Sequence, residues 1–184
     1  MKIKKHIFLG LLALSLLAGC NKKDNIDENV IAGKQVPKDI TLELVTTNGE
    51  DVTVMRKNGL WIFKNYPNKI VLVNFFATWC PPCKAEIPHL NNLLAKYNKD
   101  FQVLSVVVEE NKPNADLLAF IKEHDIKYPI ANSKVNFEFA NAVGGVDGIP
   151  AMFLFNKKGE MIANYVGATQ EEILDSDISK NIGK

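Results

Sequence analysis

The sequence has few cysteines, which excludes a scaffold held together mainly by disulfides. Cys20, Cys80 and Cys83 are the only three among 184 residues. Cys80 and Cys83 are separated by two residues, and no second Cys-x-x-Cys pair exists to complete a structural zinc site. His89 is the nearest further metal-ligand candidate. We therefore expect no metal here and interpret Cys80 and Cys83 as a redox dithiol.

The chain also lacks an excess of charge of either sign. Lys and Arg number 22 against 21 Asp and Glu, and three of the lysines (Lys2, Lys4 and Lys5) lie in a segment without acidic residues. This balance gives no support to a nucleic-acid-binding role. With 47% hydrophobic residues and no internal repeat, the composition excludes a disordered or fibrous protein and allows an ordinary buried core.

No apolar run is long enough for a comfortable membrane span of about 20 residues. The stretch 7–18 follows a basic start and ends in small residues, so we expect a secretory signal peptide at 1–19. Leu17-Ala18-Gly19-Cys20 resembles the lipobox of bacterial lipoproteins. That resemblance implies lipidation of Cys20, and the alternative is an ordinary signal peptide with a spare thiol.

Downstream of this segment, the polar residues 20–38 lack periodicity and are interpreted as a tether, followed by a domain at 39–184. Alternation at 40–44 and 52–55 around Asn48-Gly49 predicts an opening β-hairpin. The continuous apolar run at 70–76 predicts a central strand covered on both faces. Other strands are expected at 60–63, 101–108, 128–130, 151–155 and 161–166. Helices are expected at 81–98, from 114, at 134–143 and at 169–179. We expect Asn114 and Thr169 to cap the helices that they begin. This order predicts an α/β fold with a mixed sheet and helices on both faces.

A helix that begins near Pro81 would place Cys80 at its N-terminus. Unpaired N–H groups and the helix dipole stabilise a thiolate there, and only the thiolate is nucleophilic. Pro81 suits the first helical turn because it has no N–H to leave unpaired. Two intervening residues on a helical turn also bring the two sulfurs within bonding reach. We therefore predict that Cys80 attacks a substrate disulfide and that Cys83 resolves the mixed disulfide.

Two residues near the pair have alternative interpretations. Glu86 lies one turn after Cys83, where burial among apolar residues would raise its pKa and make it a useful base for Cys83. An exposed glutamate favoured by the helix dipole is the alternative. Trp79 shields one side of the site and contacts a partner in one interpretation, and is half-buried packing in the other.

The segments VLVNFFATWCPPCKAEIP (71–88) and GIPAMFLF (148–155) resemble the thioredoxin superfamily, and within it the TlpA/ResA-like extracytoplasmic thiol-disulfide oxidoreductases. The resemblance covers about residues 38 to 180. It implies a thioredoxin-like fold with a helix-plus-strand insertion at 109–145 and Asn74 in the place of a buried aspartate. It also implies a cis Pro150, with Ile149 offering its backbone to substrate, and Glu86 as the base. We expect the substrate-binding surface to comprise Trp79, Pro81, Pro82, Ile149 and Pro150.

The function implied is that of a monomeric, membrane-anchored periplasmic reductase of protein disulfides, for example of apocytochrome c, supplied with electrons by a membrane thiol-disulfide donor. No cofactor is expected. An oxidase or isomerase of the same fold and a non-catalytic lipoprotein or haem-handling chaperone are the alternatives. A peroxiredoxin is disfavoured, because the Thr-x-x-Cys motif is absent: Ala77 and Cys80 stand three residues before the two cysteines.

Overall fold

The computed structural model describes residues 38–183. The signal peptide predicted at 1–19, the lipidation site Cys20 and the tether up to residue 37 lie outside the described residues.

Within residues 38–183, the central sheet has five strands in the order β6-β5-β4-β7-β8. β4 (Ile70–Phe76) is buried along its whole length, pairs in parallel with β5 (Phe101–Val107) and pairs antiparallel with β7 (Ala151–Phe155). β6 (Ile130–Ala131) extends the sheet in parallel beside β5, and β8 (Met161–Val166) extends it antiparallel beside β7. The predicted mixed sheet with a continuous apolar central strand is confirmed.

The N-terminal part of the described chain forms a separate antiparallel sheet of β1 (Ile40–Val45), β2 (Asp51–Lys57) and β3 (Leu60–Phe63). The predicted hairpin is thus extended by a third strand. The end of β1 and the residues after it contact the β6 edge of the central sheet: the N–H of Asn132 donates to the Val45 carbonyl at 2.8 Å, and the N–H of Thr47 donates to the Ile130 carbonyl at 2.9 Å. The two sheets therefore share a hydrogen-bonded seam.

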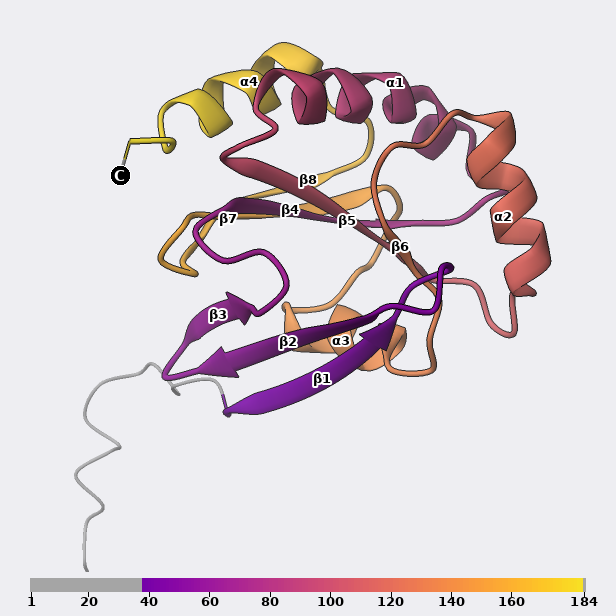
Figure 1. The fold of residues 1–184 in the computed structure, drawn as a ribbon, viewed down its shortest axis with the longest axis horizontal. Coiled ribbons are helices and arrows are strands. Elements are labelled where there is room, and N and C mark those ends of the chain that lie inside the picture. Colours follow the sequence, from indigo (N-terminus) through magenta and orange to yellow (C-terminus); the bar gives the residue numbers. More distant parts are fainter. Residues whose placement is uncertain (1–37, 184) are drawn as a thin grey trace, which may run out of the picture. The chain divides into compact units, whose positions relative to one another are not determined.

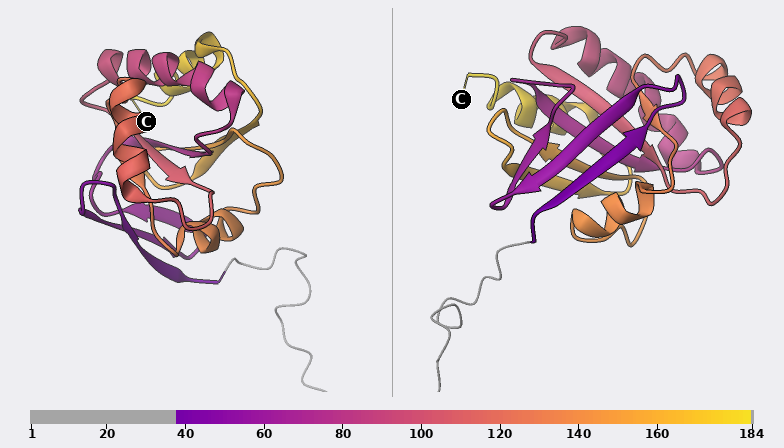
Figure 2. Two further views of the ribbon diagram at one scale, coloured as in Figure 1. Left: turned by 90° about the vertical axis from the view of Figure 1, so that its right-hand side faces the viewer. Right: turned by 60° about the horizontal axis from the view of Figure 1, so that its bottom comes forward.

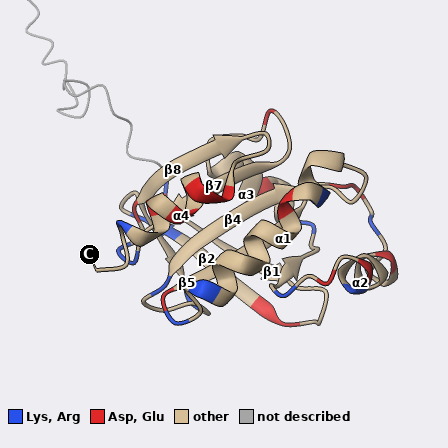
Figure 3. Cartoon of the chain, turned by 90° about the horizontal axis from the view of Figure 1, so that it is seen from above, with Lys and Arg blue, Asp and Glu red and all other residues tan. Residues whose placement is uncertain are grey.

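The helices divide between the faces of the central sheet (Figures 1 and 2). α1 (Pro81–Lys96) and α4 (Glu171–Ser179) cover one face, whereas α3 (Asn136–Ala142) lies with β1, β2 and β3 on the other. α2 (Asn114–Glu123) runs beside the β6 edge and carries side chains of both charges (Figure 3). α2, β6 and α3 make up the predicted insertion, and both helices expected within it, from 114 and at 134–143, are present.

β4 contributes to two apolar clusters because successive side chains of a strand point to opposite faces. Ile70, Leu72 and Phe76 pack under α1 and α4. On the other side the cluster contains three β4 residues, Val71, Val73 and Phe75, together with the aromatic residues Trp61, Phe63, Phe139, Phe153 and Phe155. Asn74 shares the α1 face by the same alternation.

The aromatic cluster is closed by a close approach between β3 and the β7–β8 turn. The N–H of Trp61 donates to the Gly159 carbonyl at 2.8 Å. Gly159 has φ +84°, and a Cβ at this position would lie 2.0 Å from the Trp61 carbonyl oxygen. Only glycine fits both this backbone conformation and this spacing.

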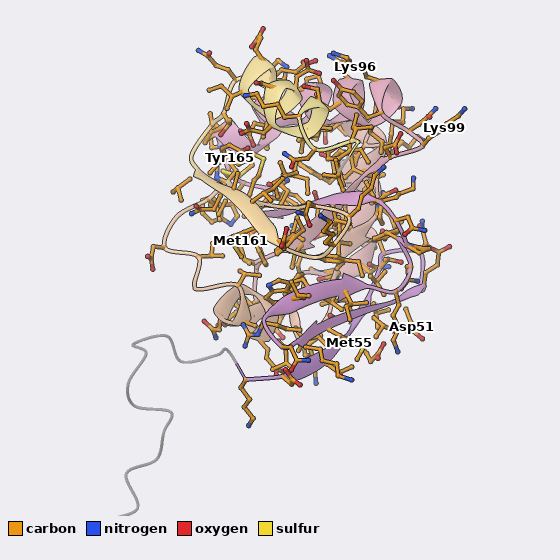
Figure 4. All side chains as sticks on the ribbon, turned by 90° about the vertical axis from the view of Figure 1, so that its left-hand side faces the viewer. Asp51, Met55, Lys96, Lys99, Met161 and Tyr165 are labelled. Atoms are coloured by element: carbon orange, nitrogen blue, oxygen red, sulfur yellow. A yellow bond between two sulfur atoms is a disulfide. The ribbon has the colours of Figure 1, made fainter. Side chains whose placement is uncertain are left out.

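Ion pairs and hydrogen bonds fasten α4 to its neighbours through Lys96 and Tyr165, which are labelled in Figure 4. The Nζ atom of Lys96, in the last turn of α1, lies 2.6 Å from Oδ1 of Asp175 on α4. The hydroxyl of Tyr165 on β8 donates to Asp177 Oδ2 at 2.7 Å. These contacts hold α4 over the sheet and thereby position the segment that leads into it.

Both predicted helix caps were wrong. Pro113 is the N-cap of α2, and the Asn114 side chain instead donates to the Thr47 carbonyl at 2.8 Å. Gln170 is the N-cap of α4, and Thr169 uses its N–H for a contact with α1 described below. The Asn114 side chain is thus used in a tertiary hydrogen bond, whereas Thr169 lies one residue before the N-cap and bonds α1 through its main chain. In residues 38–183, no helix combines the length and apolar character that a membrane crossing requires.

Candidate active site

Cys80 is the N-cap residue of α1, with extended backbone angles of φ −84° and ψ 111°. Its Sγ accepts a hydrogen bond from the N–H of Cys83 at 3.3 Å, as a capping side chain does. Pro81 opens the helix, as predicted. A sulfur at this position faces the unpaired N–H groups of the first turn, so a thiolate on Cys80 would be stabilised.

Cys80 and Cys83 form a disulfide with 5.3 Å between their Cα atoms. The predicted proximity of the two sulfurs is therefore confirmed. Both residues are only 3% exposed. A redox partner thus has narrow access to the pair.

The loop before β7 lies against the disulfide. The Ile149–Pro150 peptide bond is cis, as the resemblance implied. The Ile149 carbonyl oxygen lies 3.9 Å from Cys80 Sγ, and the Pro150 carbonyl accepts from the N–H of Gly167 at 2.8 Å. The main chain of Ile149 therefore borders Cys80 directly. A pocket of about 360 Å³ continues from this loop and is lined by Val108, Phe137, Ala140, Asn141, Val146, Asp147, Gly148 and Ile149.

Trp79 is exposed: 66% of its surface is accessible, so it is not the half-buried packing residue of one interpretation. It belongs to a turn in which the N–H of Cys80 donates to the Ala77 carbonyl at 3.2 Å. The N–H of Thr78 donates to Glu109 Oε1 at 2.5 Å. An apolar ring is therefore presented to solvent directly beside the disulfide.

Glu86 is buried, with 3% exposure, so the exposed alternative is wrong. Its Oε1 accepts from the N–H of Thr169 at 2.7 Å, whereas Oε2 has no partner among the described residues. Burial raises the pKa of Glu86 to about 7, against smaller lowering contributions from the Thr169 hydrogen bond and the charge of His89. A carboxyl group with this pKa both takes up and releases a proton near neutral pH.

Further buried polar groups occupy the α1 face of the sheet. Asn74 Nδ2 donates to Ser105 Oγ at 3.1 Å, and Asn74 Oδ1 has no partner among the described residues. Burial raises the pKa of Tyr128, and the charge of Glu86 adds a smaller contribution in the same direction. Glu86, Asn74 and Ser105 are therefore buried on the face that carries the disulfide.

Sequence reasoning missed Glu109 and Thr169. Glu109 follows β5, and Thr169 precedes α4; neither belongs to a motif, and both reach the site only through the packing of distant segments. A carboxyl residue just beyond a strand that neighbours β4 was the available signal for Glu109, because parallel strands end at the same edge of a sheet. For Thr169 no signal was present.

Residues 31–182 match the Redoxin family. Thiol-disulfide oxidoreductase ResA from Bacillus thuringiensis subsp. konkukian is 28% identical over 174 residues, which cover 95% of this chain and 90% of that protein.

Solved structures show the same fold. A thiol:disulfide interchange protein of the thioredoxin family from Chlorobium tepidum is similar with a TM-score of 0.62 and 24% identity, covering 83% of this chain and 100% of that one. StoA from Bacillus subtilis is similar with a TM-score of 0.58 and 24% identity, covering 76% and 97%. The expected thioredoxin-like architecture is confirmed.

Proposed function

Because the chain belongs to the Redoxin family and is a thiol-disulfide oxidoreductase, we propose that it works as a reductase of protein disulfides through the Cys80/Cys83 dithiol. Disulfide-bearing proteins are its general substrate class. The observation that carries the proposal is the position of Glu86 one turn after Cys83 on α1: both residues are buried, and the pKa of Glu86 is raised to about 7.

The reaction has two exchange steps. The Cys80 thiolate attacks one sulfur of a substrate disulfide, forms the mixed disulfide and releases the other substrate sulfur as a thiol after protonation. Cys83 then loses its proton to Glu86 and attacks Cys80 Sγ. The second substrate thiol leaves, and the Cys80–Cys83 disulfide remains. Two electrons and two protons have passed from the protein dithiol to the substrate.

In this proposal Glu86 supplies the base that the second step requires. Cys83 is buried, and burial disfavours a thiolate, so proton removal limits resolution. Glu86 Oε2, which has no partner among the described residues, is the free acceptor, while Oε1 is held by Thr169. The carboxyl is thereby oriented and still able to take a proton.

The residues around the disulfide make the substrate-binding surface. Trp79 offers an exposed apolar ring on one side, and the Ile149 main chain next to Pro150 offers hydrogen-bonding groups to an extended peptide on the other. Pro81 and Pro82, between the two cysteines, complete the surface. Apocytochrome c is one candidate substrate.

The proposed location is the periplasmic side of a bacterial membrane, to which a lipid on Cys20 anchors the domain. The proposed oligomeric state is a monomer. The lipobox-like Leu17-Ala18-Gly19-Cys20 supports this placement. In an oxidising compartment a reductase needs a dedicated electron supply. We therefore assign a membrane thiol-disulfide protein as the donor that returns the Cys80–Cys83 disulfide to the dithiol.

Equilibration with glutathione and dithiothreitol buffers, followed by acid quenching and thiol counting, measures the reduction potential. We expect a value near that of thioredoxin, about −270 mV. A value near that of DsbA, about −120 mV, would contradict the reductase and favour the oxidase.

Substitution of Glu86 by Gln tests the assigned base. Resolution of a preformed mixed disulfide, followed by stopped-flow release of a labelled peptide thiol at pH 7, should slow about a hundredfold. Glu172→Gln, an exposed carboxyl in the first turn of α4, is the matched control and should leave the rate unchanged. Equal rates for Glu86→Gln and wild type would remove Glu86 from the mechanism.

A further inference from the structure

Glu109 lies at the edge of the sheet from which the active-site turn leaves. The N–H of Val108 donates to the Phe76 carbonyl at 3.0 Å and joins the end of β5 to the end of β4. The next residue, Glu109, then reaches the turn after β4, where its Oε1 accepts from the N–H of Thr78 at 2.5 Å. The Glu109 side chain is only 13% exposed.

This carboxylate is therefore attached to the turn that presents the nucleophile. Thr78 precedes Cys80 by two residues, and the N–H of Cys80 donates a hydrogen bond to the Ala77 carbonyl, which closes the turn. Successive Cα atoms are about 3.8 Å apart, so the backbone of Thr78 lies close to that of Cys80. The Glu109 carboxylate, bound to the Thr78 N–H, is therefore near enough to a Cys80 thiolate for the two negative charges to repel each other in this partly buried site.

Lys112 partly neutralises this charge. Its Nζ lies 3.8 Å from Glu109 Oε2 and 3.6 Å from Asp116 Oδ2, and its side chain is 20% exposed. Lys112 is shared between two carboxylates and contacts Oε2 of Glu109, whereas Thr78 binds Oε1. It therefore compensates Glu109 only in part.

We propose that Glu109 is a positioning residue that makes the Cys80–Cys83 couple more reducing, and that Lys112 limits its effect. The proposal rests on the proposed reductase function. The hydrogen bond to Thr78 holds the turn, while the negative charge disfavours the Cys80 thiolate of the reduced protein and leaves the uncharged disulfide unaffected. Destabilising the reduced form lowers the reduction potential, which is the inverse of the effect that makes DsbA an oxidant.

The effect can be measured in the equilibrium with glutathione. In this reaction two molecules of reduced glutathione reduce the protein disulfide to the dithiol and become one molecule of glutathione disulfide. Glu109→Gln keeps an oxygen acceptor for the Thr78 N–H and removes the negative charge together with its ion pair to Lys112. Lys112→Met keeps an apolar stem of similar length and removes the neutralising cation. The two substitutions therefore change the net charge near the turn in opposite directions.

We expect Glu109→Gln to raise the equilibrium constant for reduction by glutathione about tenfold, which corresponds to about 30 mV for a two-electron couple. Lys112→Met should lower the same constant about threefold. Glu110→Gln removes the same charge one residue later from an exposed side chain that makes no hydrogen bond or ion pair with the described residues, and should change the constant less than twofold.

Shifts of the same sign in Glu109→Gln and Lys112→Met would overturn the proposal, because a merely loosened turn would act alike in both. An equal shift in Glu110→Gln and Glu109→Gln would overturn it as well, since general surface charge would then suffice. A strongly oxidising wild-type potential combined with opposite shifts would refute the reductase function and leave the role of Glu109 supported.

Discussion

The two faces of the central sheet differ in what they bury. The face under β1, β2, β3 and α3 packs aromatic rings together: Phe139 lies 5.6 Å from Trp61 and 5.5 Å from Phe75 between ring centroids. The face under α1 and α4 buries the disulfide together with Glu86, Asn74 and Ser105. Both faces contain an apolar core, but the one buried polar side chain of α3, Asn136, has its hydrogen bonds made, to the Val107 and Ala131 carbonyls at 2.9 Å.

Within the described part of the chain, only the α1 face buries polar side-chain atoms that lack a hydrogen-bond partner, and such atoms lower the stability of the fold. Glu86 Oε2 and Asn74 Oδ1 are the two buried side-chain polar atoms without a partner in residues 38–183, and both belong to this face. A buried unpaired polar atom typically costs about 1–3 kcal/mol. We call the face under β1, β2, β3 and α3 the aromatic face and the face under α1 and α4 the chemical face. Packing on the aromatic face offsets the free-energy cost of the unpaired polar atoms on the chemical face. The two faces should therefore respond differently to substitution.

The largest expected effect is on the aromatic face. Phe139→Ala removes a fully buried ring and should lower the free energy of unfolding by about 3–5 kcal/mol in urea denaturation. Phe137→Ala on the same helix is the control, because Phe137 is 42% exposed, and should cost less than about 1 kcal/mol. In the folded Phe139→Ala protein, the equilibrium with glutathione should stay within twofold of wild type. A larger redox shift would mean that the faces are not separable.

The next effect is the pH dependence of stability on the chemical face. The pKa of Glu86 is about 7 in the folded protein, above its ordinary value of 4.5, so the folded chain retains a proton that the unfolded chain has released between these pH values. Stability from this group is fully present below pH 4.5 and is lost as the pH rises to about 7. The difference amounts to up to about 3 kcal/mol at 1.36 kcal/mol per pH unit.

Glu86→Gln should remove this dependence and flatten the curve of unfolding free energy against pH, measured in urea from pH 4 to pH 8. Glu172→Gln should retain the wild-type slope. If Glu86→Gln has the same slope as wild type, the carboxyl does not carry the proton uptake in this range.

The smallest effect concerns the hydrogen bond between Asn74 and Ser105. A double-mutant cycle of Asn74→Leu and Ser105→Ala should give a coupling energy of about 1 kcal/mol, because removing either partner alone leaves the other buried without its bond. Urea denaturation of the four proteins provides the values. A coupling near zero would mean that this polar contact adds nothing to stability.

The sequence predicted well what depends on local pattern. Spacing alone placed Cys80 at the helix start, and the unbroken apolar run of 70–76 identified the central strand. The cis Pro150 came from the family resemblance, since composition does not distinguish a cis from a trans X–Pro bond.

What the sequence could not predict depends on contacts between distant segments. Glu86 is buried because the segment before α4 covers it, and the Thr169 N–H that bonds it is 83 positions away. Glu109 meets Thr78 only because β4 and β5 end side by side. Of the two wrong caps, Asn114 uses its side chain for a long-range hydrogen bond to Thr47, whereas α4 begins one residue later than the local pattern predicted, with Gln170 as its N-cap.

The contact between Trp61 and Gly159 also affects the order in which the chain can fold. Trp61 packs against Phe139 and Phe155 and bonds Gly159, all of which follow it by many residues. During synthesis, a chain that emerges N-terminus first exposes β1, β2 and β3 long before their covering residues emerge. Such late-closing contacts slow folding and leave apolar surface open to aggregation. A chain that stops short of Gly159 therefore cannot close this face, whatever the state of its cysteines.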